Sequence, residues 1–413
     1  MLYPSHNIRY RISQILSLHW WAFTQQHKRW IRPVVFETVK RIVSCRTPAL
    51  GFHLYGCPCC GYLRIVPHSC KSRFCPTCGK HATDRWANRV LNNLLNVHYH
   101  HIILSVPWEL RPVILLNRVL CFNILFKAAT KSIQDWAKSQ CGMRMGIILV
   151  LHTFGSDLRF HPHIHLIVTG GGLSLDGKRW IETDPKFLMP HKGLKLRWRY
   201  NVVALFREHH KKGDFRFSSA SKFLKKYPCF NSLLNKIYQY TWYAYIGASL
   251  LDPTASVRYV GRYTKRAVLA EYRITFFDGK YLRFRFKDYA QGGKTKYKAL
   301  PVFAFIGRLI RHIPDKRFPM MRHAGLFANR YKAKYLALAR KALGQDESSP
   351  SEEELSDPTW RERQTEYTAQ DPLMCPYCHI PMSLLGTLFG SHWELWLIWE
   401  YVQNQSIYPP APG

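Results

Sequence analysis

The chain has 413 residues, of which 47% are hydrophobic, and its 60 Lys and Arg residues against 26 Asp and Glu give a formal net charge of +34 at pH 7. This size leaves room for two or three domains with at least one hydrophobic core. The charge predicts a polyanionic partner, most simply nucleic acid. A merely solubilising surface or a membrane-surface role fits less well, because basic residues stand among aromatic ones in LKLRWRYNVV and YLRFRFKDY.

The sequence also argues against export and membrane insertion. Its start, MLYPSHNIRYRISQIL, has no long apolar core behind a basic cap, so no secretory signal is expected. The most apolar stretch, residues 383–402, contains His392, Glu394 and Glu400 and predicts a buried helix rather than a membrane span. Most of the 12 cysteines are grouped at short, metal-like spacings rather than spread as a disulfide framework. We therefore expect reduced cysteines in a cytoplasmic protein.

Residues 1–92 are expected to form an N-terminal helical and zinc-binding domain. Within CPCCGYLRIVPHSCKSRFCPTC, two Cys-x-x-Cys pairs, Cys57/Cys60 and Cys75/Cys78, are separated by 14 residues. Four thiolates in two such pairs predict one tetrahedral zinc site. Its role is expected to be structural, since four cysteine ligands leave no position for water.

Other ligand sets remain open at this stage. Cys59 or Cys70 is available to replace one of the four ligands, and Cys45 with His53 to form a second site. The alternative is that these cysteines bind no metal and are only small buried side chains. The zinc module is expected to present three basic side chains to DNA, namely Arg64, Lys71 and Arg73.

The pattern from residue 93 to 340 predicts one α+β domain. Buried strands are indicated at 98–107, 145–154 and 163–170, and a helix with apolar spacing at 117–139. The polar turn GSDLRFHP joins the second and third strands into a hairpin. The sheet is therefore expected to be antiparallel and flanked by helices.

The rest of the chain divides into four further segments. Residues 175–245 are basic and helix-rich, and they are expected to be a helical insertion. Residues 252–272 begin with the Asp-Pro start of a helix, and residues 272–286 predict a hairpin that turns at an Asp-Gly pair. An acidic, Ser- and Pro-rich composition predicts a linker over 341–370.

Residues 371–413 are expected to form a C-terminal tail that carries CPYC. Its two cysteines, Cys375 and Cys378, are half of a metal site. Three readings stay open: the pair recruits His379 or His392, it dimerises with a second chain, or it binds nothing.

The stretch HPHIHLIVTGGG (161–172) places histidines at alternate positions of a strand. His163 and His165 share one face. Because buried imidazoles need polar partners, they are either structural histidines or ligands of one divalent metal ion. His161 is a third candidate ligand, although Pro162 leaves its direction open. The glycines are expected to end the strand and to let a DNA backbone approach closely.

About one hundred residues downstream, RYVGRYTKR places Tyr259 and Tyr263 four residues apart, so that both hydroxyls share a helix face. Four cations suited to phosphate surround them, namely Arg258, Arg262, Lys265 and Arg266. An aromatic stripe packed on the sheet is the alternative, but such stripes rarely alternate with four cations. A placed phenol, cationic cover and a metal ion are what tyrosine attack on a DNA phosphate requires.

Together, His-aliphatic-His and a later helix bearing Tyr-x-x-x-Tyr resemble the HUH endonuclease superfamily. The order of motifs is similar to that of its rolling-circle transposases, the insertion-sequence-91 family. These motifs are CRTPALGFHLYGCPCCG, SCKSRFCPTCG, FGSDLRFHPHIHLIVTGGGL, YVGRYTKR and FPMMRHAGLFANR, and the resemblance runs from about residue 30 to 335. It implies an HUH-type central antiparallel sheet flanked by helices, beside a small zinc-binding domain.

The resemblance further implies a bacterial, DNA-associated enzyme that nicks and joins single-stranded DNA at transposon ends. His163 and His165 would hold Mg²⁺ or Mn²⁺, and the phenolate of Tyr259 or Tyr263 would form a 5′-phosphotyrosine link and leave a free 3′-OH. Since a ligand imidazole must be neutral, activity is expected to fail at acidic pH.

Two questions stay open from the sequence. The third metal ligand is His161, Asp157 or a residue beyond Tyr263. The function is that of the transposase, or that of a plasmid relaxase or replication initiator with the same chemistry. A non-enzymatic zinc-containing DNA-binding protein is the third reading, and it leaves the histidines and tyrosines without a role.

Overall fold

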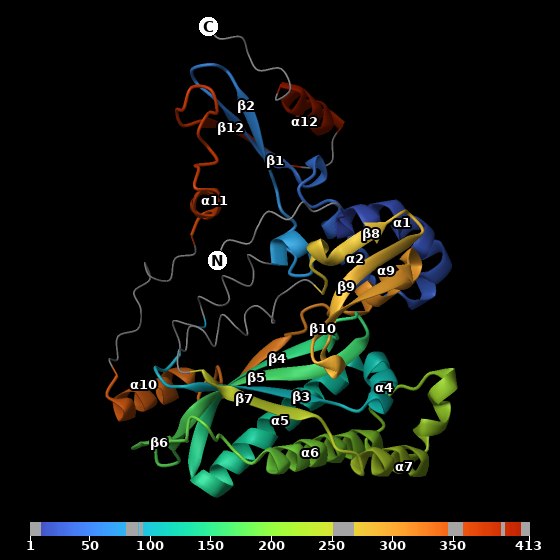
Figure 1. The fold of residues 1–413 in the computed structure, drawn as a ribbon, viewed down its shortest axis with the longest axis vertical. Helices are drawn as coiled ribbons and strands as arrows, with labels where there is room; N and C mark the ends of the chain where they lie inside the picture. Colours follow the sequence, from blue (N-terminus) through green and yellow to red (C-terminus); the bar gives the residue numbers. More distant parts are fainter. Residues whose placement is uncertain are drawn as a thin grey trace.

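The computed structural model describes residues 10–79, 90, 94–250, 268–345, 358–389 and 393–405. Three antiparallel sheets follow one another along the long axis of the molecule, each with helices packed beside it (Figure 1). The α+β class predicted from the sequence is confirmed. In the described part of the chain no helix is long and apolar enough to cross a membrane.

The largest sheet has the strand order β11-β4-β5-β3-β7, with β6 paired to β5. Its strands are β3 (Tyr99–Ser105), β4 (Met143–Phe154), β5 (Phe160–Ser174), β6 (Trp180–Glu182), β7 (Ala244–Leu250) and β11 (Met321–Gly325). The hairpin of β4 and β5 confirms the one expected from their apolar runs. Since side chains alternate along β5, Ile164 and Leu166 enter one hydrophobic core while His163 and His165 lie on the other face.

Helices pack along the core side of this sheet (Figure 1). They are α4 (Arg111–Leu116), α5 (Arg118–Cys141), α6 (His191–Lys211) and α7 (Tyr227–Tyr238). Large buried side chains such as Phe122, Trp198 and Phe206 fill the space between helices and sheet. The region expected to be a helical insertion therefore supplies much of this core. On the opposite face, α10 (Lys332–Leu343) packs against Ile148 and its neighbours.

A smaller sheet and three helices form the middle part of the molecule. They are β8 (Ile274–Phe277), β9 (Tyr281–Asp288), β10 (Lys294–Pro301), α1 (Ile12–His27), α2 (Pro33–Val43) and α9 (Val302–Arg311). The predicted hairpin is confirmed as β8 and β9. Leu16 of α1 and Phe305 of α9 share one buried core. Buried Arg118 of α5 connects this part to the large sheet, because its Nε lies 3.1 Å from Asp315 Oδ2.

The third part joins residues 52–67 to the C-terminal part of the chain. It contains β1 (Phe52–Gly56), β2 (Leu63–Pro67), β12 (Ser383–Leu388), α11 (Trp360–Thr368) and α12 (Trp393–Gln405). The prediction of one buried helix over 383–402 is wrong. Its first residues pair as β12 with the edge of β1, which leaves fewer backbone groups of that edge unpaired, and α12 exposes Trp396 and Tyr401.

The cores do not follow the order of segments expected from the sequence. The N-terminal helices pack with residues 268–313, and β1 pairs with β12, so both contacts cross the expected boundaries at 92 and 340. The helix expected over 252–272 lies almost wholly outside the described residues, as do residues 346–357 of the expected linker. The described ends of that linker belong to α10 and α11.

The three glycines of β5 do not end the strand, which continues to Ser174. A β-carbon at Gly170 would lie 1.9 Å from His98 Nε2, and one at Gly172 would lie 2.5 Å from the carbonyl oxygen of Arg144. Protein groups thus fill the space expected for a DNA backbone, and that interpretation is wrong. The glycines instead allow neighbouring parts of the protein to pack closely.

Gly172→Ala is expected to lower the free energy of unfolding by about 2 kcal/mol, since the new β-carbon meets backbone that has no flexible end to move. Gly193→Ala in α6 is the matched control, because its nearest atom is Pro190 Cβ at 3.7 Å. There, alanine is expected to leave stability unchanged or to raise it by about 0.5–1 kcal/mol. Urea unfolding measures both, and equal stability of Gly172→Ala and the unmodified chain would contradict the close packing.

Candidate functional site

Three histidines come together on the face of the large sheet turned away from α5 and α6. His163 and His165 lie on β5, as the sequence predicts, and the third is His152 of β4. The antiparallel register places His152 opposite His163 and Val150 opposite His165, so the three imidazoles share this face. One nitrogen of each ring lies within 4.8 Å of the other two.

Hydrogen bonds orient two of these rings. Nδ1–H of His163 donates to the carbonyl oxygen of His161 over 2.8 Å, which leaves Nε2 available to coordinate a metal ion. Nδ1 of His165 lies 2.8 Å from Nε2 of buried His101 on β3, and the two rings stack. Bonds of this kind fix the tautomer and the direction of metal-binding histidines.

Burial keeps the imidazoles of this cluster neutral. Desolvation lowers the pKa of His163 to about 4. The Arg111 charge lowers this pKa further, whereas the hydrogen bond to His161 raises it. Desolvation and the neighbouring histidines hold the pKa of His165 well below its usual value, and burial lowers the pKa of His101 to about 4. Neutral imidazole is the form that coordinates a metal, so the donor set fits a divalent cation.

The structure does not bring the other sequence-derived candidates to this cluster. His161 accepts a hydrogen bond from Arg111 at Nδ1, and its Nε2 lies 3.1 Å from Ser105 Oγ. Both ring nitrogens are thus engaged within the protein, and among the described residues His152 rather than His161 completes the cluster, so His161 as the third ligand stays a prediction. Asp157 forms an ion pair with Arg159 instead.

The lowered pKa values predict a loss of stability in acid. In the unfolded chain histidine has its ordinary pKa of about 6.5, so below that pH the unfolded state takes up protons first. The stabilisation is full above pH 6.5 and is lost as the pH falls toward the folded-state pKa of about 4. At pH 5, His101 and His163 are each expected to lower the free energy of unfolding by about 2 kcal/mol relative to pH 7.

Urea unfolding of the metal-free chain at pH 7 and pH 5 measures this effect. His101→Gln is expected to reduce the difference between the two values, because it removes one of the titrating groups. Identical unfolding free energies at both pH values would contradict the neutral cluster. For the same reason, the failure of activity in acid is expected at a lower pH than the ordinary pKa of histidine implies.

The tyrosine motif lies outside the described residues. This holds for Tyr259 and Tyr263 and for the four cations beside them, which are Arg258, Arg262, Lys265 and Arg266. The described chain on either side belongs to different parts of the fold. Before the motif, β7 pairs with β3, and its last residue, Leu250, lies opposite Tyr99. After it, Val268 is buried in one core with Leu158, which precedes β5.

The cysteines form two clusters rather than the single predicted site. Cys75 and Cys78 lie with Cys45 and Cys70. The Sγ atom of Cys78 is 3.5 Å from that of Cys45 and 3.6 Å from that of Cys70. Sulfurs bonded tetrahedrally to zinc at about 2.3 Å lie about 3.8 Å apart, so these distances fit a zinc site.

The predicted pairing of the two Cys-x-x-Cys motifs is therefore wrong. Cys57 and Cys60 belong to the second cluster, which β1 and β2 hold apart from the first. The alternative second site of Cys45 with His53 is also wrong. The Nδ1 atom of His53 lies 2.9 Å from the Thr387 hydroxyl, and exposed Cys59 belongs to neither cluster.

The basic residues expected to face DNA from the zinc module have different surroundings. Lys71 and Arg73 are exposed, and Arg73 Nη2 donates to the carbonyl oxygen of Phe318 over 3.3 Å. Arg64 is partly buried and donates to the carbonyl oxygen of Pro372. Its contact therefore joins β2 to the C-terminal segment, and DNA contact by Lys71 and Arg73 stays a prediction.

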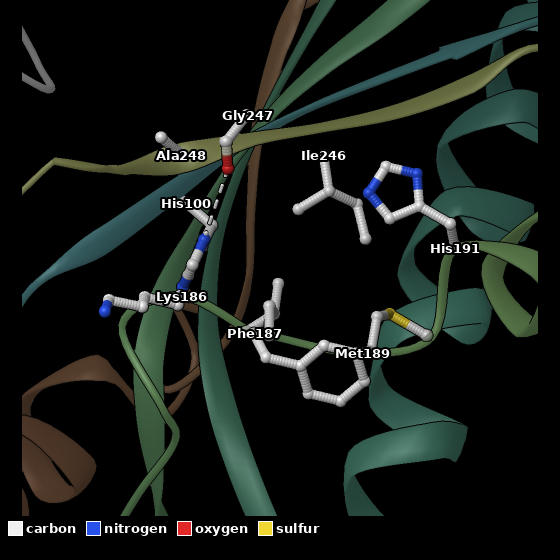
Figure 2. A pocket seen from close by; sticks show the side chains of 9 residues that line it. His100, Lys186, Phe187, Met189, His191, Ile246, Gly247 and Ala248 are labelled. Atoms are coloured by element: carbon white, nitrogen blue, oxygen red, sulfur yellow. Dashed lines mark hydrogen bonds between the residues drawn. The ribbon is translucent and has the colours of Figure 1, made fainter.

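A small cavity lies on the other side of the large sheet (Figure 2). Its lining includes His100, Lys186, Met189 and His191, and its volume is about 100 Å³. The Nδ1–H of His100 donates to the carbonyl oxygen of Gly247 over 3.4 Å. Ligand pockets usually measure about 300–1,000 Å³, so this cavity does not compete with the histidine cluster as the functional site.

Comparisons with known proteins relate both sites to transposases. Residues 146–334 match a family described as "Putative transposase", and residues 15–106 match one described as "Transposase zinc-binding domain". The histidine cluster lies within the first match and the Cys45 cluster within the second. The second match and the cysteine clusters together support structural zinc.

Two relatives extend these matches over most of the chain. It is 33% identical over 344 residues to "Putative transposase y4qJ" of Sinorhizobium fredii (strain NBRC 101917 / NGR234), which covers 82% of this chain and 85% of that protein. It is 29% identical over 367 residues to "Transposase for insertion sequence element IS801" of Pseudomonas savastanoi pv. phaseolicola, covering 87% and 85%. No solved structure matches the chain.

Proposed function

This chain belongs to the insertion-sequence-91 family of transposases, and we propose that it nicks and joins single-stranded DNA at transposon ends through a 5′-phosphotyrosine intermediate, in rolling-circle-type transposition. The observation that carries the proposal is the cluster of His152, His163 and His165 on one face of the large sheet. The segment that carries Tyr259 and Tyr263 joins β7 to Val268, which is buried in the core that also contains Leu158. We propose that one of these tyrosines is the nucleophile that acts at the cluster.

In the proposed reaction, a tyrosine oxygen bonds to phosphorus while the bond from phosphorus to the 3′ oxygen breaks. The phenol loses its proton as its oxygen bonds to phosphorus, and the departing 3′ oxygen takes up one proton and becomes a free 3′-OH, so the protons balance. The phosphodiester energy is kept in the tyrosine link, so the strand is rejoined without ATP. When bound at the three histidines, a divalent cation supplies polarisation of the non-bridging phosphate oxygens. Two tyrosines allow one strand end to be held while a second strand is cut.

Positive charge at the more exposed end of the cluster supports phosphate binding there. His152 and His165 are buried, whereas His163 is partly exposed. Arg111 is also partly exposed, contacts His161 and lowers the pKa of His163 through its charge. We assign Arg111 the role of holding the scissile phosphate, since a guanidinium binds phosphate oxygens in pairs.

The donor set favours Mn²⁺ over Mg²⁺ among the two expected cofactors. In the described part of the chain the cluster consists of three imidazoles and no carboxylate. Mg²⁺ prefers oxygen ligands, whereas imidazole suits first-row transition metals better. DNA cleavage is accordingly expected to be faster with Mn²⁺ than with Mg²⁺ at equal concentration.

A labelled single-stranded oligonucleotide that carries a transposon end tests the proposal. With Mn²⁺, we expect a protein–DNA adduct that survives denaturing electrophoresis, and a second product whose 3′-OH a polymerase extends. With a chelator, neither product is expected. Cleavage without an adduct, or equal cleavage of fully duplex DNA, would contradict the proposed chemistry. Binding without cleavage would instead favour the non-enzymatic reading.

A second assay separates transposition from nicking at a single origin. Two oligonucleotides that carry the two different ends of the element are mixed with the protein and Mn²⁺. A joined product that contains sequence from both ends is expected of the transposase. Re-ligation of each end only to itself would favour the relaxase or replication initiator.

A further inference from the structure

A second cysteine cluster lies in the part of the molecule that contains β1, β2 and β12 (Figure 1). Cys57 and Cys60 stand between β1 and β2, and Cys375 and Cys378 precede β12. The Sγ atoms of Cys60 and Cys375 are 3.7 Å apart, although 315 positions separate the two residues. We propose that these four cysteines hold a second structural zinc ion, which fastens the C-terminal segment to the N-terminal sheet.

The two halves of this cluster have the same backbone conformation. In CPCCGY and in CPYCHI, the amide of the first cysteine donates to the carbonyl five positions on, over 2.8 Å from Cys57 and 2.9 Å from Cys375. The carbonyl of that cysteine accepts from the amide four positions on, over 3.0 Å and 3.1 Å. That position has a positive φ in both loops, +71° at Gly61 and +52° at His379.

The two loops share the positive φ even though one of them has a histidine at that position. A histidine with positive φ is uncommon, yet His379 takes the position that glycine fills in the other loop. Two loops far apart in sequence thus form the same turn and direct their cysteines at one another. A tetrahedral metal bound by one Cys-x-x-Cys pair from each loop accounts for both observations.

The sulfur geometry and the burial select zinc. The separation of 3.7 Å fits the edge of a tetrahedron with bonds of about 2.3 Å and is far longer than a disulfide bond of about 2.05 Å. Cys57 and Cys375 are buried, yet the only other buried members of their hydrophobic cluster are Tyr62 and Met382. Such a small core is typical of modules that a metal stabilises.

Contacts along the C-terminal segment show what the ion would hold in place. β12 pairs with β1 over its whole length, and Arg64 donates to the carbonyl oxygen of Pro372. A β-carbon at Gly51 would lie 2.1 Å from the carbonyl oxygen of Leu388, so β1 begins where only glycine admits the neighbouring strand. The zinc-binding match ends at residue 106 and contains only the N-terminal half of this site.

Metal analysis of the full chain, purified under reducing conditions and passed over a chelating resin, tests the proposal. Cys375→Ser/Cys378→Ser is expected to lower the zinc content by one equivalent per chain. Cys59→Ser is the matched control, because exposed Cys59 lies in the same motif and outside the cluster; its zinc content is expected to equal that of the unmodified chain. Unchanged zinc in the double variant, or iron in place of zinc, would overturn the proposal.

Thiol labelling of the unmodified chain keeps the test independent of how the variant folds. In the zinc-loaded protein, Cys57, Cys60, Cys375 and Cys378 are expected to resist alkylation while Cys59 reacts. After chelation the four thiols are expected to become reactive together, which peptide mass spectrometry resolves. Rapid alkylation of Cys375 and Cys378 in the zinc-loaded protein would overturn the proposal.

Discussion

Replacing both Tyr259 and Tyr263 with phenylalanine is expected to lower covalent attachment to single-stranded DNA at least about a thousandfold, since no phenol oxygen is left to attack the phosphorus. Phenylalanine keeps the aromatic ring, so a stripe that only packs against the sheet would tolerate the change. The substitution therefore separates the nucleophile from its alternative. The adduct is quantified by denaturing electrophoresis with a labelled oligonucleotide and Mn²⁺.

The matched control is Tyr243→Phe/Tyr245→Phe. Both tyrosines are exposed, at 57% and 45%, and they lie at the start of β7, the strand that leads into the motif. This control is expected to keep normal adduct formation. Metal binding and thermal stability of Tyr259→Phe/Tyr263→Phe are expected to match the unmodified chain. A double variant that still forms adduct at the normal rate would show that another group is the nucleophile.

The elements that carry the histidines could be predicted because their signals are local. The apolar runs at 145–154 and 163–170 are long, and a polar turn separates them, so the hairpin of β4 and β5 follows from periodicity alone. Alternation along β5 then places His163 and His165 on one face. Periodicity gave the wrong element for residues 383–402. Their first residues form a strand because they pair with the free edge of β1.

The third histidine depends on register, which periodicity does not give. His152 ends the apolar run MGIILVLHTF, and a lone histidine at a strand end is usually structural. Pairing His152 with His163 requires the exact length of the turn, including the positive φ of Leu158. The number of residues between the two strands was the only information in the sequence on which residues pair across the turn. His161 was a candidate third ligand from the sequence, and its contact with Arg111, on a separate helix, depends on the fold.

The cysteine pairing was beyond local reasoning for a different reason. Spacing within a motif predicts which cysteines share a loop, and both Cys-x-x-Cys pairs were identified correctly as metal-like. Which loops meet is a property of the fold: Cys60 lies beside Cys375 only because β12 returns to β1. Long-range pairings of this kind leave no periodic trace in the chain. The half-site in CPYC was the remaining sign that a partner was missing.

His152→Ala is expected to lower Mn²⁺ affinity and the rate of DNA cleavage by about a hundredfold or more, because it removes one of the three proposed ligands. His163→Ala/His165→Ala is expected to abolish both. His101→Gln, which disturbs only the bond that orients His165, is expected to lower metal affinity by about 10–100-fold. Electron paramagnetic resonance of free Mn²⁺ measures the affinities, and single-turnover cleavage measures the rates.

His161→Gln is the variant that decides between the two candidate third ligands. It removes the imidazole that bonds Arg111, but it keeps the backbone carbonyl that accepts from His163. Mn²⁺ affinity is therefore expected to change less than about tenfold, while cleavage falls further because Arg111, the proposed phosphate-binding residue, loses its hydrogen-bond partner. Circular dichroism confirms that each variant is folded. If His161→Gln loses the metal and His152→Ala keeps it, the ligand set of β4 and β5 is wrong, and the cation is held at the exposed end of the strand.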